Sequence, residues 1–570
     1  MELWTCVLLL CAAAVCVTCE QQPPSDEDWL ELDTPQGPVR GRRDPNADVY
    51  AFYGIPYATA PTGANRYKPP LPAPNWTEPI GAIDEHIICP QAAFGEVNLL
   101  LKAQEDCLIA NIYVPNTQEK NLSVFVNVHG GAFIFGHGGT YVANNLLKNK
   151  DIILVNFNYR LGIHGFLCLG TEDVPGNAGM KDQVELLRWV QKNIASYGGN
   201  PNDVTLGGYS AGSASVDLLM LSKSAEGLFH RVIPESAGNL AAFSVQRDPI
   251  DIAKYQAKKL NFENVDDISA LEQFYKTASW ELLTSDPFMD RPDSTFLFAP
   301  CVERESEDEA FLTESPLSIL QKGSYKKLPI LYGFANMEGL FRIDYFNDWK
   351  EKMNEKFSDF LPADLTFESE AQKEEVANKI KEFFFEDKPI SEQNVLSYVD
   401  YFSDVLFAYP MLWAVKHYVE AGNNEIYLYE YSFVDENTPL VPHANVRGAN
   451  HCAQTLTVLD GVDEASETPE MQNMRKAIRE LWRNFIKTGK PSDEWKPAGA
   501  NRAPYMDLGV KVELKDEPLL GPRNELWDDI YGKYYRDSVP PKTTNNASLL
   551  TSSFILAHLI MIVHYFMSVQ

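Results

Sequence analysis

Residues 204–220 read VTLGGYSAGSASVDLLM, and this stretch does most to decide the fold. A short β-rich run passes through a turn into a helical pattern, with Ser210 in the turn between Gly208 and Gly212. Only residues without a side chain allow the flanking backbone to pass so close to a sharply bent turn. We therefore predict a strand, a tight turn and a helix, with Ser210 exposed at the edge of a sheet as a candidate nucleophile.

Similar β-rich runs recur along the chain, separated by helical stretches. They are residues 124–128, 152–157, 231–233, 328–333 and 426–433. A helix is predicted for residues 181–195, where apolar side chains recur at helical spacing. Apolar strands that alternate with helices predict an α/β fold with a large, mostly parallel central sheet flanked by helices on both faces. Ligands of such sheets bind beyond the carboxyl ends of the strands, so the loops that follow these runs are the places to search for chemistry.

One such loop follows residues 124–128 and begins with His129, Gly130 and Gly131. The backbone N–H groups of Gly130 and Gly131, together with that of Ala211 after the candidate nucleophile, are placed to converge on an oxyanion. Each such donor is typically worth ~3 kcal/mol in the transition state. Taken alone, the two glycines also fit an ordinary turn.

A serine hydroxyl needs a base, and the base needs an acid, in the chain order Ser, Asp or Glu, His. His443 and His451 both follow the run 426–433, and the residues alone leave both open, although residues 448–450 (GAN) form a flexible turn before His451. Glu338 follows the run 328–333 and is the candidate acid. Its position is the only reason to prefer it over a solvated surface glutamate.

The two ends of the chain look like processing signals. Residues 1–19 hold an apolar run and end with Val17 and Cys19 at the spacing that signal peptidase reads, which predicts a secretory leader. A membrane anchor is the alternative, but the apolar run is shorter than the ~20 residues that span a bilayer. Residues 537–570 form a polar stalk and an apolar tail with no Lys or Arg after it. This pattern predicts exchange for a glycosylphosphatidylinositol anchor, and a retained tail helix and a disposable tail stay open.

Composition excludes several functional classes. The 570 residues include 45% hydrophobic ones, enough for a large core, which excludes wholesale disorder. Lys and Arg number 49 against 79 Asp and Glu, for a net charge of -30, so the chain repels nucleic acid and anionic lipid surfaces. Residues 20–536 contain no linker or repeat and are expected to form one domain. They also lack a Cys-x-x-Cys motif, metal-spaced histidine pairs and a phosphate loop, so no metal or organic cofactor is expected.

If the chain is exported, its cysteines can form disulfides and its Asn-x-Ser/Thr motifs can be glycosylated. Five cysteines remain after the leader, so at least one is unpaired; Cys89 and Cys107 are near enough in sequence to close a small loop worth ~3 kcal/mol. We expect the others, Cys168, Cys301 and Cys452, to be small buried hydrophobes. Asn75 and Asn121 lie in glycosylation motifs, and Asn546 lies in the tail, where it is lost or serves the anchor site.

Several motifs occur in one fixed order along the chain. They are residues 53–58 (YGIPYA), 105–108 (EDCL), 129–131 (HGG), 158–162 (NYRLG), 176–179 (GNAG), the turn around Ser210, 336–338 (NME) and 448–451 (GANH). Over nearly all of the chain after the leader, this set resembles the type-B carboxylesterase and cholinesterase family of α/β-hydrolases. Residues 168–200 are especially similar to insect carboxylesterases, including those of juvenile-hormone and odorant turnover.

The resemblance implies a role for each candidate residue. It implies a catalytic triad of Ser210, Glu338 and His451, which favours His451 over His443. It also implies an oxyanion hole from Gly130, Gly131 and Ala211, a Cys89–Cys107 disulfide and a small-molecule ester as the partner.

Departures from the family pattern bear on the substrate. Tyr209 stands where cholinesterases place a glutamate, and no tryptophan lies between Cys89 and Cys107, where they carry the platform for a quaternary ammonium group, so a choline ester is not expected. The family's second cysteine pair after the nucleophile is also missing from residues 260–274. Residues 296–300 are similar to the segment that walls the acyl pocket. There Phe296 and Phe298 would favour short acyl groups such as acetate, and ordinary core aromatics are the equal alternative.

These expectations define a secreted serine carboxylesterase, tethered to the cell surface only through its lipid anchor, that acts on neutral apolar esters such as short-acyl acetates, odorant or xenobiotic esters. A juvenile-hormone esterase is the nearest alternative. A non-catalytic adhesion protein on the same fold and a serine peptidase on an α/β-hydrolase scaffold are the other two. The residues set neither the natural ester nor the oligomeric state.

Overall fold

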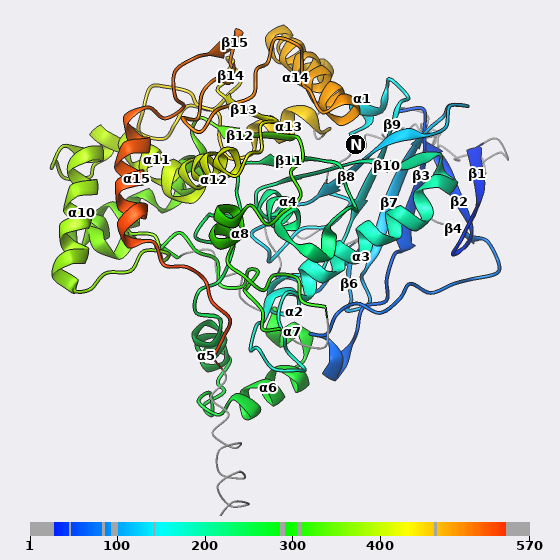
Figure 1. Cartoon of the computed structure of the whole chain (residues 1–570), viewed down its shortest axis with the longest axis horizontal. Helices are drawn as coiled ribbons and strands as arrows, with labels where there is room; N and C mark the ends of the chain where they lie inside the picture. Colours follow the sequence, from blue (N-terminus) through cyan, green and yellow to red (C-terminus); the bar gives the residue numbers. More distant parts are fainter. Residues whose placement is uncertain are drawn as a thin grey trace, which may run out of the picture.

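The structure is a computed structural model of the chain (Figure 1). It describes residues 28–44, 47–81, 86–92, 101–140, 143–284, 291–305, 309–460 and 464–542. The predicted leader, the apolar tail and the glycosylation motif at Asn546 lie outside the described residues. Asn75 and Asn121 are described, and both are exposed.

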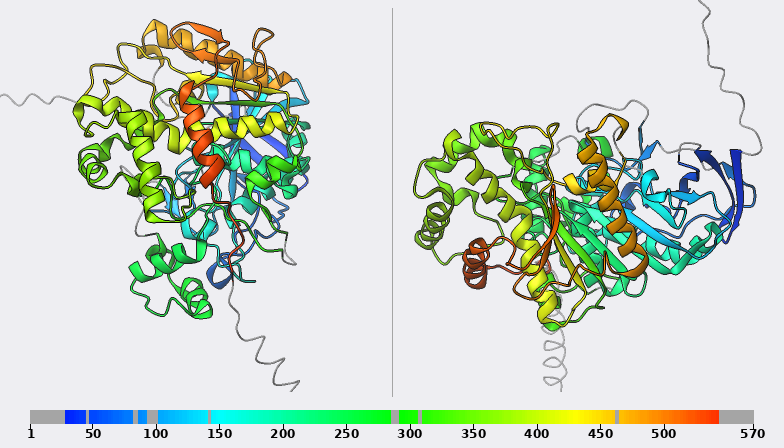
Figure 2. Two further views of the ribbon diagram at one scale, coloured as in Figure 1. Left: turned by 60° about the vertical axis from the view of Figure 1, so that its left-hand side comes forward. Right: turned by 90° about the horizontal axis from the view of Figure 1, so that it is seen from above.

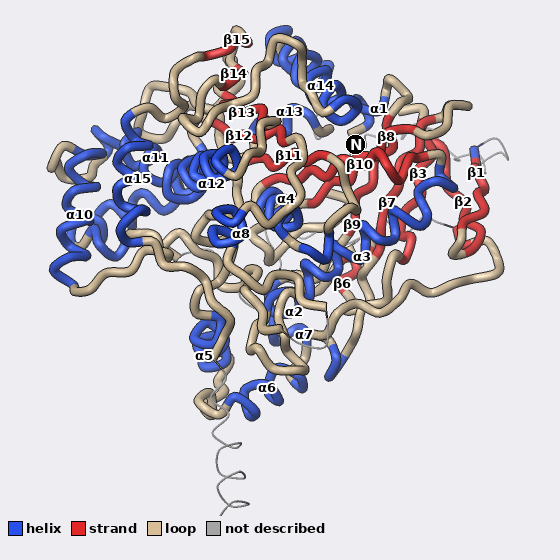
Figure 3. The backbone as a smooth tube through the Cα atoms, in the orientation of Figure 1, coloured by secondary structure: helices blue, strands red, loops and turns tan. Residues whose placement is uncertain are grey.

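A sheet of 13 strands, within the described residues, runs through the molecule (Figure 3). Between β9 and β14 all neighbouring strands pair in parallel, whereas the pairs from β1 to β9 at one edge and β14 with β15 at the other are antiparallel; the short β4 is parallel to β2. In spatial order the strands are β1 (Trp29–Thr34), β2 (Gly37–Asp44), β3 (Val49–Pro56), β7 (Ile109–Pro115), β9 (Ile152–Phe157), β8 (Leu122–Val128), β10 (Gly199–Tyr209), β11 (Arg231–Glu235), β12 (Ile330–Ala335), β13 (Ile426–Tyr431), β14 (Tyr505–Leu508) and β15 (Val512–Lys515), with β4 (Ile80–Gly81) beside β2. A separate small pair is β5 (Ile87–Ile88) and β6 (Lys102–Ala103).

The central strands are apolar on both faces because each face is covered. In β8, Val124 and Val126 point into one core cluster, which also contains Leu187 of α3 (Ala178–Asn193). The intervening Phe125 points into a second cluster, which contains Trp482 of α14 (Pro469–Thr488). Successive side chains of a strand point to opposite faces, so an unbroken apolar run is what a sheet between two cores requires. The predicted α/β fold with helices on both faces is confirmed.

The remaining helices fall into three groups. Nearer the sheet lie α1 (Asn144–Leu147), α2 (Gly162–Phe166), α4 (Ala211–Leu221), α8 (Pro316–Lys322) and α13 (Ala453–Val458), whereas α15 (Pro522–Tyr534) packs against the third group, with Trp527 contacting Phe384 and Tyr401. The helices α5 (Pro249–Lys259), α6 (Ile268–Thr277) and α7 (Trp280–Leu283) lie below the sheet in Figure 1. The third group is α9 (Phe346–Glu355), α10 (Glu370–Phe385), α11 (Val395–Ser403) and α12 (Tyr409–Glu420).

The third group forms a helical region at one end of the sheet, opposite the strands β1 to β3; it is yellow-green in Figure 2. It is entered through the eight-residue 3₁₀ helix η5 (Glu338–Tyr345), which begins shortly after the end of β12. Between α11 and α12 the helix widens into a π turn, η8 (Asp404–Ala408). Such turns occur frequently at functional sites. The helical region therefore borders the carboxyl end of β12, where the candidate acid begins η5.

Most predicted element bounds are close to the observed ones. The run 152–157 coincides with β9, whereas β10 begins five residues before the predicted Val204. The predicted helix over 181–195 begins earlier, at Ala178, because Asn177 in a left-handed conformation starts it, and it ends at Asn193. Helix ends are less regular than helix centres, so such offsets are expected.

The cysteines differ from the prediction at one pair. The expected bond between Cys89 and Cys107 is present, with Cα atoms 5.0 Å apart. Cys168 and Cys301, expected to be separate buried hydrophobes, are instead joined in a second disulfide. Both are buried as predicted, but 133 residues separate them, so their proximity depends on how the loops pack and not on spacing in the sequence. Cys452 is free and buried.

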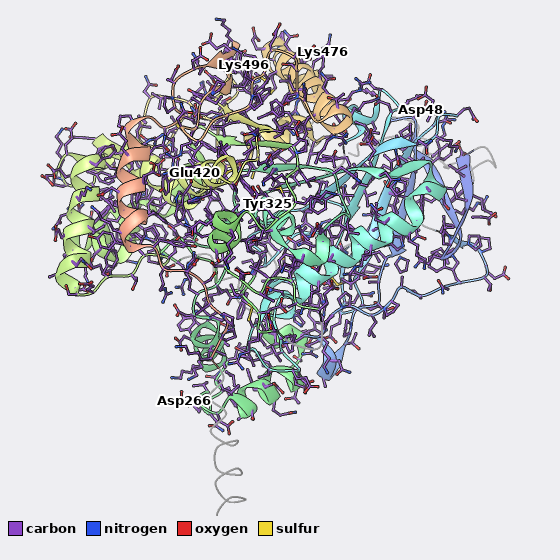
Figure 4. All side chains as sticks on the ribbon, viewed as in Figure 1. Asp48, Asp266, Tyr325, Glu420, Lys476 and Lys496 are labelled. Atoms are coloured by element: carbon purple, nitrogen blue, oxygen red, sulfur yellow. A yellow bond between two sulfur atoms is a disulfide. The ribbon has the colours of Figure 1, made fainter. Side chains whose placement is uncertain are left out.

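Acidic side chains are spread over the surface of the molecule. Asp48, Asp266 and Glu420, labelled in Figure 4, lie on widely separated parts of it. Asp48 pairs with Arg43 and Lys150, and Asp266 pairs with Lys254. The negative charge is therefore a general surface property in these regions and does not mark one binding face. Within the described residues, no helix combines the length and apolar character needed to cross a bilayer.

Candidate active site

Ser210 lies in a strained turn between β10 and α4. Its backbone angles are φ 55° and ψ −126°, a combination that residues with a side chain rarely adopt. Its N–H donates to the carbonyl of Glu235 over 2.9 Å, and its carbonyl accepts from the N–H of Ala214 over 3.0 Å. These two bonds tie the turn to β11 on one side and to the first turn of α4 on the other.

At Gly208 and Gly212, on either side of Ser210, the backbone lies in close contact with the backbone of other residues. A Cβ at Gly208 would lie 2.5 Å from the carbonyl oxygen of Gly212. A Cβ at Gly212 would lie 2.2 Å from the carbonyl oxygen of Val128 and 2.7 Å from that of His129. Real Cβ atoms do not approach backbone this closely, so the prediction that only glycine fits these two positions is confirmed.

Ser210, His451 and Glu338 form a continuous hydrogen-bonded series. The Ser210 Oγ lies 2.9 Å from His451 Nε2, and His451 Nδ1 lies 2.5 Å from Glu338 Oε2. The second carboxylate oxygen, Oε1, accepts the N–H of Ala335 over 2.8 Å. Glu338 is fully buried, and the His451 side chain is 10% exposed. The other candidate, His443, lies instead beside the ring of Phe346 and the carboxylate of Glu392.

The loops that carry the acid and the imidazole are joined to each other through their backbones. The Ala449 N–H donates to the Asn336 side chain over 3.0 Å, and the Met337 N–H donates to the Ala449 carbonyl over 3.0 Å. A Cβ at Gly448 would lie 2.0 Å from the Met337 sulfur. The motifs Asn-Met-Glu and Gly-Ala-Asn-His therefore pack as one unit, which sets the distance between Glu338 and His451.

A second set of polar groups, which the sequence analysis missed, lies behind His451. Gln454 of α13 donates to the Ser236 hydroxyl over 2.6 Å. The carboxylate of Glu235 accepts from Thr455 and, over 2.7 Å, from the indole of Trp482. Glu235 thus holds α13 with its side chain and Ser210 with its carbonyl. The sequence offered one signal for this set, because Glu235 and Ser236 lie two and three residues after the predicted strand 231–233.

Burial determines the protonation of two groups in this set. Burial raises the pKa of Glu235 to about 7, although Thr455 and Trp482 both donate to the carboxyl. Burial also raises the pKa of the Cys452 thiol well above its usual range. A protonated, buried thiol is a poor nucleophile, so Cys452 is a packing residue beside the imidazole.

The loop after β8 contains Gly130 and Gly131, two of the predicted oxyanion donors. Gly131 has φ 110°, and its carbonyl accepts from the N–H groups of Ile134 and Phe135. Among the backbone bonds outside helices and strands in the described residues, none uses the N–H of Gly130 or Gly131 as donor. Ala211 is the first residue of α4, where an N–H has no partner within the helix. We therefore keep Gly130, Gly131 and Ala211 as the predicted donors to a bound oxyanion.

A neutral histidine supports this loop. Burial lowers the pKa of His129 to about 3, so the ring is uncharged, and its Nδ1–H donates to the Gly130 carbonyl over 2.8 Å. The ring stacks on Tyr159 at 4.4 Å, and the Tyr159 hydroxyl donates to the His129 carbonyl over 3.0 Å. The oxyanion loop is therefore held from beneath by two stacked rings.

Four phenylalanines form a cluster of touching rings beside His451, and two of them contact the imidazole; we call them the phenylalanine cluster: Phe243, Phe296, Phe341 and Phe407. Phe407, in the π turn η8, stacks on His451 at 4.2 Å, and Phe341 meets the same ring at 5.1 Å. The four rings close a circuit, with centroids 4.9 Å apart for Phe243–Phe296, 6.4 Å for Phe296–Phe341, 5.9 Å for Phe341–Phe407 and 5.8 Å for Phe407–Phe243.

Of the two residues predicted to wall an acyl pocket, Phe296 belongs to this cluster. Phe298 is also buried, but no ring contact between described residues involves it. Beyond the cluster, Phe243 and Phe296 line a cavity of about 290 Å³. The wall beside the imidazole is therefore apolar and aromatic.

A serine at a strained strand-to-helix turn, aligned with an imidazole and a buried carboxylate at the carboxyl edge of a mostly parallel sheet, defines the α/β-hydrolases. Comparison with known proteins agrees with this class. Residues 28–527 match the carboxylesterase family, and the chain belongs to that family of carboxylic ester hydrolases.

Individual relatives include several insect esterases. Esterase FE4 of Myzus persicae is 32% identical over 481 residues, which are 80% of this chain and 84% of that protein. Juvenile hormone esterase of Heliothis virescens is 31% identical over 476 residues, 78% of this chain and 82% of that protein. The crystal structure of juvenile hormone esterase from Manduca sexta, with OTFP covalently attached, has a TM-score of 0.79 at 28% identity and covers 88% of this chain and 100% of that one.

The close approach at Gly212 predicts a large effect from one methyl group. Gly212→Ala should lower the free energy of unfolding by at least about 2 kcal/mol, because the Cβ meets two carbonyl oxygens that cannot move without breaking the turn. Gly532→Ala in α15 is the matched control: no atom lies within 4 Å of its Cβ, and it should raise stability by roughly 0.5–1 kcal/mol. Urea unfolding measures both, and equal effects would refute the packing argument.

The buried carboxyl of Glu235 predicts a dependence of stability on pH. Because the folded-state pKa, about 7, lies above the ordinary value of 4.5, the folded protein keeps the proton to higher pH than the unfolded chain does. The contribution of this group to stability is therefore largest at low pH and is lost as pH rises from about 4.5 to 7, by about 3 kcal/mol in total.

Glu235→Gln should remove this loss. The stability of the variant relative to the unaltered protein should rise between pH 4.5 and pH 8, as measured by urea unfolding at both values. The exposed Glu226→Gln is the control and should show no such change. Parallel curves for Glu235→Gln and the unaltered protein would contradict the assignment.

Proposed function

We propose that the protein is a serine carboxylesterase that hydrolyses neutral, apolar carboxylic esters. The single observation that carries the proposal is the hydrogen-bonded series from Ser210 through His451 to the buried Glu338. In this reaction the Ser210 hydroxyl attacks the ester carbonyl while its proton passes to His451 Nε2. Glu338 accepts the Nδ1–H bond and keeps the ring oriented through the proton transfer.

The remaining steps use the same groups. The N–H groups of Gly130, Gly131 and Ala211 bind the oxygen that becomes negative in the tetrahedral intermediate. His451 then returns its proton to the leaving alcohol, the ester C–O bond breaks, and an acyl enzyme forms on Ser210. A water molecule gives its proton to His451 and attacks the acyl carbon, and the acid leaves as Ser210 recovers its proton.

The surroundings of the imidazole support an apolar substrate. The phenylalanine cluster offers aromatic rings to the group that lies beside His451, with the buried Arg342 guanidinium lying over Phe341 and Phe296. Tyr209, at the position before the nucleophile, is half-buried, and its ring and carbonyl pack against Gly130. A cationic alcohol therefore has no acidic partner at residue 209. It also lacks the tryptophan platform that cholinesterases carry between the residues matching Cys89 and Cys107. We propose that short-acyl acetates, odorant esters or xenobiotic esters are the preferred class.

Location follows from the ends of the chain and from its disulfides. We propose that residues 1–19 are removed as a leader and that residues 20–536 act as one catalytic domain. In residues 537–570, the polar stalk would stay and the apolar tail would be exchanged for a glycosylphosphatidylinositol anchor at the small residues near 545–548. Two disulfides fit an oxidising compartment, and the exposed Asn75 and Asn121 are accessible to glycosylation. The enzyme would then act outside the cell.

A second candidate is a juvenile hormone esterase. It is favoured by the TM-score of 0.79 to the juvenile hormone esterase of Manduca sexta. Such a substrate joins a long apolar acid to a small alcohol, whereas an acetate ester joins a short acid to a longer alcohol. Phe296 beside the acyl side of the site favours the second arrangement, and comparing the two kinds of ester separates the candidates.

The catalytic proposal predicts the effect of two substitutions on hydrolysis of 4-nitrophenyl acetate. Ser210→Ala should lower kcat by about 10⁴-fold or more because it removes the attacking oxygen. Glu338→Gln should also lower kcat by about 10⁴-fold, because an amide next to His451 favours the wrong tautomer of the ring. An organophosphate should inactivate only the unaltered protein and any variant that keeps an active Ser210.

The alternatives give different results in the same assays. A non-catalytic adhesion protein would give no Ser210-dependent turnover, and a peptidase would show Ser210-dependent turnover of the matching amides as well as of the esters. His443→Gln is the control for His451→Gln: it should keep activity near that of the unaltered protein, and the reverse result would contradict the choice of base.

The position of Phe296 predicts the preference for acyl length. The unaltered protein should hydrolyse 4-nitrophenyl acetate with a higher kcat/KM than 4-nitrophenyl decanoate, and Phe296→Ala should shift this ratio toward decanoate by about tenfold or more. Phe298→Ala tests whether the second phenylalanine contributes. Phe274→Ala, which removes a stacked ring on α6, is the control and should leave the ratio unchanged.

Two results would remove the acyl-pocket proposal. One is an equal kcat/KM for acetate and decanoate in the unaltered protein, and the other is no response of the ratio to Phe296→Ala or to Phe298→Ala. A terpenoid methyl ester as the best substrate would favour the juvenile hormone esterase candidate.

A further inference from the structure

The disulfide that the sequence analysis missed lies next to the predicted acyl-pocket wall. Cys301 comes directly after residues 296–300, and its partner Cys168 lies in the loop between α2 and α3. Both side chains are 1% exposed. Residues 291–305 belong to no helix or strand of the fold, apart from an isolated bridge between Cys301 and Gln246. The position of an irregular segment depends on its tethers, because no ladder of hydrogen bonds fixes it.

One side chain holds the backbone of Cys301 on both sides. The Asn177 Oδ1 accepts the Cys301 N–H over 2.8 Å, and the Asn177 Nδ2 donates to the Cys301 carbonyl over 2.8 Å. The same Nδ2 donates to Glu303 over 2.8 Å, and Glu303 also pairs with Lys181 of α3 at 2.5 Å. Residues at the start of α3 therefore bind Cys301 and Glu303, which directly follow the predicted acyl-pocket wall.

The loop before α3 is shaped around the sulfur atoms. Gly176 has φ 109°, and a Cβ there would lie 2.6 Å from the Cys301 sulfur and 2.8 Å from the Cys168 sulfur. Residue 176 has to be glycine for the disulfide to occupy this place. Gly176 thus leaves room for the two sulfur atoms, and Asn177 binds the backbone of Cys301.

A third attachment of the wall segment is made by Gln246, in the loop that follows Phe243. The Gln246 N–H donates to the Pro300 carbonyl over 2.7 Å, and its side chain donates to the carbonyls of Ala299 and of Phe166 in α2. The wall segment is thereby attached at residues 299, 300 and 301 to elements that pack on the central sheet. Phe296, five residues before Cys301, is held where its ring meets Phe341.

We propose that the Cys168–Cys301 disulfide and the Asn177 carboxamide act together as positioning groups that hold the acyl-pocket wall in place and so limit the length of the acyl group. The inference rests on the proposed carboxylesterase function and deepens it. Without these tethers the irregular segment would yield to a long acyl chain, whereas a short chain does not reach it. The tethers therefore determine specificity without touching the reacting atoms.

The test compares kcat/KM for 4-nitrophenyl acetate, butyrate and decanoate, which share one leaving group. In the full-length Cys168→Ala/Cys301→Val protein, which fills the space of the disulfide, acetate hydrolysis should stay within about threefold of the unaltered value. The acetate-to-decanoate ratio should fall by about tenfold. Asn177→Ser, with the disulfide intact, should shift the ratio in the same direction by a smaller factor.

Removal of the other disulfide is the matched control. Cys89→Ala/Cys107→Ala also loses one bond, but that bond borders β5 and Asn158 and not the wall segment. It should lower Tm and leave the acetate-to-decanoate ratio unchanged. A structural role alone would lower hydrolysis of all three esters in parallel, so the ratio separates positioning from simple loss of stability.

The outcomes are distinguishable. A ratio that is unchanged in the folded double variant overturns the proposal, and so does an unchanged ratio in Asn177→Ser if the double variant does not fold. An equal shift in the Cys89→Ala/Cys107→Ala control also overturns it. If the unaltered protein hydrolyses none of the three esters, the proposed function fails first, and the inference built on it falls with it.

Discussion

The structure depends on a single close approach between two backbones. The carbonyl oxygen of Val128, at the end of β8, lies where a side chain at residue 212 would begin, 2.2 Å from its Cβ. Because residue 212 is glycine, the first turn of α4 can lie against the end of β8, which brings Ser210 next to the loop of Gly130 and Gly131. The proposed nucleophile and the proposed oxyanion donors are therefore positioned by the same contact, and the bonds to Glu235 and Ala214 hold Ser210 in its strained conformation.

Glu338 and His451, the proposed acid and base, are positioned in another way, because the two loops that carry them are hydrogen-bonded to each other. Asn336, Met337 and Ala449 exchange backbone and side-chain hydrogen bonds, so Glu338 and His451 move as one unit. Behind them Glu235 joins β11 to α13 and to Trp482, and so links the imidazole loop to the turn of Ser210. Two rigid units meet at the 2.9 Å contact between Ser210 and His451, and aromatic rings from the helical region close one side of it.

Sequence reasoning predicted those features that local pattern determines. Apolar runs bounded by turns gave β9 in full, and glycine spacing gave the strand, turn and helix around Ser210. Features that depend on contacts between distant segments were beyond it. Cys168 and Cys301 are 133 residues apart, and nothing local marks them as partners, although Gly176 is explained once they are joined. The choice between His443 and His451 needed either the family resemblance or the geometry, since both follow the same strand. Phe296 and Phe298 alternate along the chain, and only packing shows that Phe296 faces the cluster beside His451.

The most direct measurement of the central claim is where an activated phosphonate reacts. The folded protein is treated with a fluorophosphonate, digested and analysed by mass spectrometry, with heat-denatured protein as the control. The account predicts one adduct per chain, on the peptide that contains Ser210, and none on the denatured protein, because only the assembled Ser210, His451 and oxyanion loop activate that hydroxyl. An adduct on a different residue, or no adduct on the folded protein, would contradict it.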